Sequence, residues 1–282
     1  MINKILGIKY GRGCLAVASD AAPAHAPDSI QQMFPDLEWT MVLPSPFNAE
    51  ECKRDRFGEN FQIQQKIYNA TTTDKHILIG GDHSVNYGHF VKLSNNIPDT
   101  DLCLVYIDAH MDLHTPESSI AQASGAPHGT NVRALLGDGD IRWMTLQQKR
   151  PALRPENLFY LATRSAEPAE IEYATENNIY IRHASELQKL SDIENVITEI
   201  RAKIGNRPYV VSFDFDAIDP ALFCDVLVPA PGGITVETAV KLLHGFHDAF
   251  GFEFVEYAPS GDSASAQIVR QLISLAIGDL GE

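Results

Sequence analysis

The sequence is poor in several features that mark whole classes of protein. Its 282 residues include only four cysteines, Cys14, Cys52, Cys103 and Cys224, which are far apart and form no C-x-x-C pair. This spacing argues against a zinc knuckle and against a dense disulfide framework. No apolar run approaches the roughly 18 residues of a membrane span, and the apolar run near the N-terminus is too short for a signal peptide. We therefore expect a soluble, cytoplasmic protein.

Positive charge is scarce as well. The chain has 22 Lys plus Arg against 37 Asp plus Glu, a formal net charge of −15. A protein that binds the phosphate backbone of nucleic acids needs a basic face, so nucleic acid is not an expected partner. The content of 44% hydrophobic and 21% charged residues is typical of a globular protein and excludes a disordered or fibrous one. The composition does not say where in the fold this surplus of negative charge lies.

Short apolar runs rich in β-formers alternate with longer segments of helical period, a pattern typical of parallel strands joined by crossover helices. The expected strands are Ile5–Ile8, His76–Ile79, Leu102–Ile107, Leu158–Ala162, Asn178–Ile181, Tyr209–Phe213 and Phe252–Glu256. The expected helices are Phe61–Ala70, Val85–Leu93, Pro168–Asn177, Leu190–Ile204, Val236–Phe250 and Ala264–Ile277. The stretches Ala21–Pro46 and Pro116–Pro127 are predicted loops. We expect one α/β domain over residues 1–282, with its site beyond the carboxyl ends of the strands.

Two polar clusters follow expected strands directly. The first, Gly80-Gly81-Asp82-His83-Ser84, has two glycines that permit a tight turn and bring His83 near the top of the sheet. The second is Asp108-Ala109-His110-Met111-Asp112. In an extended segment its first, third and fifth side chains share one face, so two carboxylates and an imidazole converge. Unpaired, these groups would repel and be costly to bury, and a divalent cation removes both problems.

A third cluster, Ser212-Phe213-Asp214-Phe215-Asp216, again has two aspartates on one face, while Asp219-Pro220 after it is a predicted turn. Two strand ends with alternating acids imply one shared cation site. The candidate ligands are His83, Asp108, His110, Asp112, Asp214 and Asp216. Six ligands exceed the needs of one tetrahedral ion and suit a two-ion centre. Carboxylates and imidazoles without thiolate favour Mn²⁺, with Zn²⁺, Fe²⁺, Co²⁺ or Ni²⁺ compatible by ligand type.

In this order, the motifs GGDHS, DAHxD and SxDxDxxDP resemble the hallmark motifs of the ureohydrolases, the family of arginase, agmatinase and formimidoylglutamase, over roughly residues 76–262. The resemblance implies a three-layer α/β/α fold around a mainly parallel sheet and a centre of two Mn²⁺ ions. It assigns His83 and Asp112 to one ion and His110 and Asp216 to the other, with Asp108 and Asp214 as bridges. It also implies a homo-oligomer, a trimer or a hexamer.

Two further segments fit this resemblance. The loop Ser124–Gly129 resembles the family loop that ends in His-Gly, which makes His128 the proton-shuttling histidine. The segment Val255–Pro259 resembles the family's Glu-x-Asn-Pro, which makes Glu256 the carboxylate that holds the guanidinium. The implied reaction is attack of a metal-bridging hydroxide on the guanidinium carbon of a small guanidino substrate, with protonation of the leaving amine. The products are urea and a primary amine.

The segments that hold the substrate tail depart from the arginase pattern. His114 stands for an Asn in the run after DAHxD, and Ser124-Gly125-Ala126 stands for Ser-Gly-Asn. Glu167 lies roughly where arginases keep an acid for the substrate amine. We expect arginase-like activity with altered tail recognition, in which His114, Ser124 and Glu167 are the candidate tail contacts.

Other activities remain open from the sequence. Agmatinase, guanidinobutyrase and formimidoylglutamase activities fit the same metal ligands. A catalytically inactive metal-binding relative is a further alternative, because Val228 replaces the Thr of a family Gly-Thr-Pro and Ala258 replaces the Asn of Glu-x-Asn-Pro. The last alternative is a deacetylase-type hydrolase with a single zinc ion.

Overall fold

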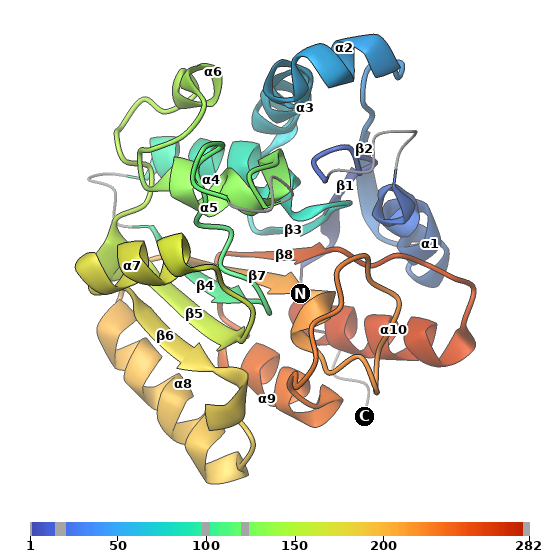
Figure 1. Ribbon diagram of the computed structural model, residues 1–282. Helices are drawn as coiled ribbons and strands as arrows, with labels where there is room; N and C mark the ends of the chain where they lie inside the picture. Colours follow the sequence, from blue (N-terminus) through green and yellow to red (C-terminus); the bar gives the residue numbers. More distant parts are fainter. Residues whose placement is uncertain (1, 15–20, 98–101, 120–123, 279–282) are drawn as a thin grey trace.

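A parallel β-sheet runs through the centre of the protein in the computed structural model, which describes residues 2–14, 21–97, 102–119 and 124–278. Within these residues the sheet has eight strands in the order β2-β1-β3-β8-β7-β4-β5-β6 (Figure 1). The strands are β1 (Lys4–Ile8), β2 (Glu38–Val42), β3 (His76–Ile79), β4 (Cys103–Ile107), β5 (Leu158–Thr163), β6 (Tyr180–His183), β7 (Tyr209–Asp214) and β8 (Gly251–Val255).

Helices cover both faces of the sheet (Figure 1). The α-helices are α1 (Ala26–Met33), α2 (Ala49–Arg54), α3 (Arg56–Ala70), α4 (Asn86–Asn96), α5 (Pro127–Leu135), α6 (Ile141–Met144), α7 (Pro168–Glu176), α8 (Leu190–Ile204), α9 (Val236–Gly245) and α10 (Ser263–Ile277). Short 3₁₀ turns are η1 (Ala22–His25), η2 (His83–Val85), η4 (Pro155–Asn157), η5 (Ala184–Glu186) and η6 (Phe215–Ala217).

Alternation along the strands divides the core into two layers. In β4, Cys103, Val105 and Ile107 belong to the same buried cluster as residues of α1, α8, α9 and α10. The intervening Leu104 and Tyr106 belong to a second cluster, with residues of α4, α5 and α7. Because successive side chains of a strand point to opposite faces, a fully buried strand needs apolar residues at nearly every position. The expected α/β/α sandwich around a parallel sheet is confirmed.

The main errors of the sequence prediction lie in the stretch Ala21–Pro46, which was expected to be a loop. It contains α1 and the strand β2. Proline is tolerated in the first turn of a helix, so Pro27 does not prevent α1. Strand β2 lies at the sheet edge and is only partly buried, so it lacks the continuous apolar run of a central strand.

Smaller differences concern element ends. Strand β6 begins at Tyr180, two residues later than expected, and α9 ends at Gly245, so Phe250 lies outside it. Helix α5 starts at Pro127, the last residue of the second expected loop. Residues 120–123 of that loop lie outside the described residues. None of the helices in the described part of the chain has the length and apolar character needed to cross a membrane.

The register of the central strands brings the polar clusters to one level. Strands β4 and β7 are neighbours with Ile107 opposite Phe213, so Asp108 and Asp214 follow side by side. Strand β8 lies on the other side of β7 with Val255 opposite Asp214, and Glu256 comes next. The parallel direction of all these strands therefore gathers their carboxyl-terminal residues at one edge of the sheet.

At the opposite end of the sheet, two histidines and a glutamate form a buried chain. Nδ1 of His76 lies 2.7 Å from the carbonyl oxygen of Asp74, and its Nε2 lies 2.8 Å from Nε2 of His89. Nδ1 of His89 lies 2.5 Å from a carboxylate oxygen of Glu253. A carbonyl can only accept, so Nδ1 of His76 carries the proton and its Nε2 accepts from His89. Burial, and then the neighbouring His89, lowers the pKa of His76 to about 4.

This arrangement makes His76 a determinant of acid stability. Its pKa in the folded protein lies below the unfolded value of about 6.5, so the unfolded chain binds the extra proton first. Stability should fall as pH drops from about 6.5 to 4, by on the order of 3 kcal/mol at most. Urea unfolding at a series of pH values measures this dependence. The free energy of unfolding of His76→Gln should fall less steeply with decreasing pH than that of the wild type. His247→Gln, at an exposed histidine, should match the wild type. Parallel curves for His76→Gln and the wild type would contradict this assignment.

Candidate metal centre

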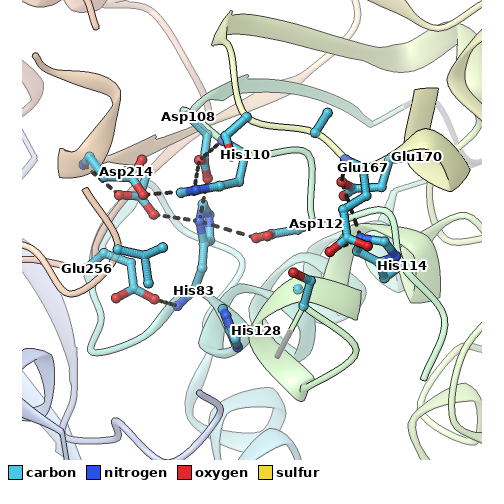
Figure 2. A pocket seen from close by; sticks show the side chains of 16 residues that line it. His83, Asp108, His110, Asp112, His114, His128, Glu167, Glu170, Asp214 and Glu256 are labelled. Atoms are coloured by element: carbon cyan, nitrogen blue, oxygen red, sulfur yellow. Dashed lines mark hydrogen bonds and ion pairs between the residues drawn. The ribbon is translucent and has the colours of Figure 1, made fainter. Parts of the chain in front are cut away.

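The carboxyl ends of β3, β4, β7 and β8 bring together the candidate metal ligands and Glu256, as Figure 2 shows for the residues that it labels. A cavity of about 260 Å³ lies there, and all eleven predicted site residues line it. They are His83, Asp108, His110, Asp112, His114, Ser124, His128, Glu167, Asp214, Asp216 and Glu256. Five lining residues were not predicted as site residues: Gly129, Ser165, Ala166, Glu170 and Val228.

One group of donors surrounds His83. Its Nδ1 lies 2.9 Å from Oδ2 of Asp108, 3.0 Å from Oδ2 of Asp214 and 3.7 Å from Oδ2 of Asp112. The other ring nitrogen, Nε2, lies 2.9 Å from the hydroxyl oxygen of Ser212, so the imidazole is held from its far side. The ligand atoms of His83, Asp108 and Asp112 all lie within 4.8 Å of one another, which is close enough for one metal ion.

A second group contains His110. Its Nδ1 lies 2.9 Å from Oδ2 of Asp216 and 3.5 Å from Oδ1 of Asp108. The ligand atoms of Asp108, His110 and Asp216 again lie within 4.8 Å of one another. Asp108 thus presents one oxygen to the His83 group and the other to the His110 group. Asp214 turns Oδ2 toward His83, while its Oδ1 accepts the backbone N–H of Asp216 at 2.7 Å.

The charges of these residues are poorly compensated by the protein alone. Asp108, Asp112, Asp214 and Asp216 are all at most 6% exposed. Burial, followed by the charge of Asp108, raises the pKa of Asp112 to about 7. Burial, followed by the charges of Asp216 and Asp108, raises the pKa of Asp214 well above its usual value. Asp112 and Asp214 therefore resist full ionisation in the absence of a cation. Burial would also raise the pKa of Asp108, but His110 and His83 lower it.

The two imidazoles respond in the opposite sense. Burial alone would lower the pKa of His83, but Asp108 and Asp214 raise it well above its usual value. Burial would also lower the pKa of His110, which Asp216 and Asp108 raise to about 12. Four buried carboxylates and two imidazoles that face them suit two divalent cations in charge and in donor type. The donor set therefore fits a binuclear metal centre.

Two of the site residues adopt a left-handed backbone conformation. Asp112 has φ 53° and Glu256 has φ 64°. Such a conformation costs a residue other than glycine about 1 kcal/mol or more and persists only where surrounding contacts impose it. The N–H of Glu256 donates to the carbonyl of Gly81 at 2.8 Å, and its Oε1 accepts the N–H of His83 at 2.9 Å. Glu256 is thereby fixed beside the His83 group.

His128 lies in the first turn of α5 and reaches the cavity wall (Figure 2). Its Nδ1 lies 3.0 Å from the carbonyl oxygen of Gly13, so this nitrogen carries a proton and Nε2 is the one left for a ligand. Burial lowers the pKa of His128 to about 4, with a further contribution from the imidazoles of His110 and His83. The ring is therefore neutral near pH 7 and offers a lone pair.

Figure 2 shows His114, Glu167 and Glu170 on the side of the cavity away from Glu256. Nε2 of His114 lies 3.3 Å from Oε2 of Glu170 and 3.5 Å from Oε1 of Glu167. Glu170 also accepts the backbone N–H of Leu113 at 3.0 Å and that of Glu167 at 2.8 Å. Glu170 thus caps α7 and joins it to the segment that carries Asp112. Ala126 is buried and does not line the cavity.

Arg164 ties two cavity segments together, although the sequence did not single it out. Its backbone N–H donates to the carbonyl of Ala109 at 2.9 Å. Its guanidinium donates, over 2.6 to 3.5 Å, to the carbonyls of Ala162, Asp216, Ala217, Ile218, Ala230 and Pro231. The planar fork of five donors suits such a set of acceptors. A polar residue directly after strand β5 was the sequence signal that could have identified it.

Comparison with known proteins gives consistent matches. A family model described as the arginase family matches residues 17–278. The chain is 27% identical over 258 residues to arginase of Staphylococcus aureus (strain MSSA476), covering 88% of this chain and 82% of that protein. Arginase from Bacillus subtilis has a similar structure, with a TM-score of 0.81 at 23% identity over 99% of both chains. Formimidoylglutamase from Bacillus subtilis also has a similar structure, with a TM-score of 0.72 at 17% identity over 99% of this chain and 87% of that one. At these identities the two structures establish a shared fold.

The repulsion among the buried carboxylates should be measurable in the metal-free protein. Asp214→Asn keeps an acceptor for the N–H of Asp216 and removes a carboxyl that the metal-free protein can bury only as an anion among other acids or by taking up a proton. After treatment with EDTA, this variant should unfold a few degrees above the wild type, since 1 kcal/mol corresponds to roughly 2–4 °C in chains of about this size. Addition of Mn²⁺ should raise the unfolding temperature of the wild type more than that of the variant.

Differential scanning fluorimetry of both proteins, with and without Mn²⁺, measures these shifts. Asp36→Asn, at an exposed carboxylate, is the matched control and should behave as the wild type. An equal Mn²⁺-dependent gain in Asp214→Asn and the wild type would exclude Asp214 from the metal centre.

Proposed function

This chain belongs to the arginase family, and from this premise we propose that it is a two-metal hydrolase that cleaves a small guanidino compound into urea and an amine. The observation that carries the proposal is the sharing of Asp108 between the His83 and His110 groups, beside a cavity that Glu256 and His128 also line. A centre with one zinc ion, as in a deacetylase-type hydrolase, would leave one of the two groups without a role.

The proposed ligands follow the two groups. His83 and Asp112 would hold one ion, His110 and Asp216 the other, and Asp108 and Asp214 would lie between them. The proximity of one Asp108 oxygen to His83 and of the other to His110 supports its bridging role. Mn²⁺ is the proposed ion, and other divalent transition metals are compatible with nitrogen and oxygen donors. When bound, such a pair of cations lowers the pKa of water and supplies a nucleophile near neutral pH.

Glu256 is the proposed anchor for the cationic end of the substrate. Glu256 is 7% exposed and lines the cavity, and one oxygen of its carboxylate accepts the N–H of His83. Burial, and then the charge of Asp82, raises the pKa of Glu256 well above its usual value, so the carboxylate gains from a cationic partner. A planar guanidinium can donate two parallel hydrogen bonds to a carboxylate, which fixes its orientation as well as its position.

His128 is the proposed proton carrier. With Nδ1 committed to the carbonyl of Gly13, only Nε2 can take up a proton from the reacting groups. An imidazolium whose pKa is about 4 is a strong acid relative to an alkylamine, whose pKa is near 10. Transfer from Nε2 to a leaving amine is therefore downhill, and the ring returns to its neutral form.

The substrate tail would meet His114, Ser124 and Glu167 on the far wall. Arginine is the first substrate to test, because the curated relatives are arginases and Glu167 is an acid on that wall. The amides expected to hold an α-carboxylate are replaced by His114, which faces two glutamates, and by Ala126, which does not reach the cavity. We therefore propose tail recognition that differs from that of arginases. Agmatinase, guanidinobutyrase and formimidoylglutamase activities are the alternatives.

A catalytically inactive metal-binding relative is the rival proposal. Val228 lines the cavity in place of a threonine, and its side chain has no hydrogen-bond donor. Ala258 donates its N–H to the carbonyl of Asp225 at 2.7 Å and lacks the amide side chain of the family's Asn.

A cytoplasmic location and assembly into a trimer or hexamer also belong to the proposal, and light scattering during gel filtration tests the assembly.

Substitution of His128 should reduce turnover without removing the metal. His128→Asn keeps a polar side chain at the cavity wall but cannot carry a proton, so kcat should fall by about 10²-fold or more. The metal content, measured by plasma mass spectrometry, should stay at the wild-type value. His247→Asn, at an exposed histidine, is the control and should keep full activity. A His128→Asn enzyme with unchanged kcat would remove His128 from the mechanism.

A substrate panel separates the candidate activities. Mn²⁺-loaded protein should be assayed for product release from arginine, agmatine, guanidinobutyrate and formiminoglutamate. Altered tail recognition predicts that another member of the panel exceeds arginine in kcat/KM, and we expect Asp108→Asn to abolish turnover of every substrate that the wild type cleaves. The highest kcat/KM on arginine would contradict altered tail recognition. Failure of every substrate, with two ions bound, would favour the inactive relative.

A further inference from the structure

A tyrosine hydroxyl lies inside the predicted metal centre, in a strand that is otherwise apolar. Tyr106 is the fourth residue of β4 and is fully buried. Since side chains two apart in a strand share a face, Tyr106 points to the same side as Asp108. Most side chains around it in this core layer are apolar. A buried hydroxyl needs a hydrogen-bond partner, and the partners of Tyr106 are both candidate metal ligands.

Tyr106 contacts two members of the His83 group. Its hydroxyl donates to Oδ2 of Asp112 at 2.6 Å and lies 3.0 Å from Nδ1 of His83. Its ring also stacks on the imidazole of His83, with centroids 4.5 Å apart and planes 11° apart. The hydroxyl and the ring therefore restrain the direction of Asp112 and the plane of His83 together. None of these contacts reaches His110 or Asp216.

Asn131 acts on the same carboxylate from helix α5. Its Nδ2 donates to Oδ2 of Asp112 at 3.0 Å and also to the carbonyl of His128. Asp112 has a left-handed backbone, so no regular element fixes the direction of its side chain. Two donors from different elements, β4 and α5, provide that direction instead. Asp112 thus depends on Tyr106 and Asn131 for its orientation.

We propose that Tyr106 is a positioning residue that selectively strengthens metal binding at the His83 group, with Asn131 as its partner. The proposal rests on the two-metal function inferred above. Residues that hydrogen-bond to metal ligands keep the ligand oriented before the ion arrives, and their loss typically costs 10–100-fold in metal affinity. Because Tyr106 contacts one group only, its loss should affect one ion and spare the other.

The test is a calorimetric titration of Mn²⁺ into the full-length protein after removal of metal with a chelator. The variants are Tyr106→Phe, which keeps the ring and removes the hydroxyl, and Asn131→Ala. Tyr87→Phe is the matched control, because Tyr87 is also fully buried but donates its hydroxyl to the carbonyl of Trp143 at 2.7 Å. Circular dichroism checks that each variant folds.

The wild type and Tyr87→Phe should each bind two ions, and each ion should bind with the same affinity in both proteins. Tyr106→Phe should bind one ion as the wild type does and the other about 10–100-fold more weakly. Its kcat should fall at limiting Mn²⁺ and recover at saturating Mn²⁺, which a general structural defect would not produce. Asn131→Ala should weaken the same ion, and the double variant should weaken it further.

Three results would each contradict a different part of the proposal. Unchanged affinities for both ions in Tyr106→Phe would remove its positioning role and leave the two-metal proposal intact. Equal weakening of both ions would also contradict the selective role of Tyr106. Binding of fewer than two ions by the wild type would overturn the two-metal function itself.

Discussion

Mutual repulsion among four buried aspartates is the constraint on which the rest of this structure depends. Asp108 and Asp112 follow β4, Asp214 ends β7, and Asp216 follows it, all close together and nearly inaccessible to water. Hydrogen bonds and two imidazoles offset part of the cost of burying these charges, and divalent cations are the simplest remaining compensation. Under the proposed two-metal function, this repulsion links metal binding to folding and to catalysis at one site.

The surrounding fold keeps these groups in place against their repulsion. The strand register places Asp108 beside Asp214, and Arg164 binds the segments that follow β4 and β7 through backbone carbonyls. Tyr106 restrains Asp112 and stacks on His83. Groups with related roles thus come from separate elements, and their mutual geometry is set by packing rather than by any local segment. Rigid support of this kind is what a preorganised metal centre requires.

Much of this could be predicted from the sequence, because the strong signals are local. Apolar runs identified the central strands, and alternating acids directly after β4 and β7 identified the candidate ligands. The edge strand β2 and helix α1 were missed, since a partly exposed edge strand has no continuous apolar run and proline-rich composition suggested a loop. Tyr106 and Arg164 were missed because their partners lie on other elements, and only the folded chain brings those partners within hydrogen-bond distance.

The central claim is that two ions share Asp108 between the His83 and His110 groups. Anomalous diffraction at the manganese absorption edge, from crystals of Mn²⁺-loaded protein, locates such ions directly. The account predicts two peaks, one next to Nδ1 of His83 and one next to Nδ1 of His110, each in contact with a different oxygen of Asp108. A single peak, or two peaks that do not both contact Asp108, would contradict it.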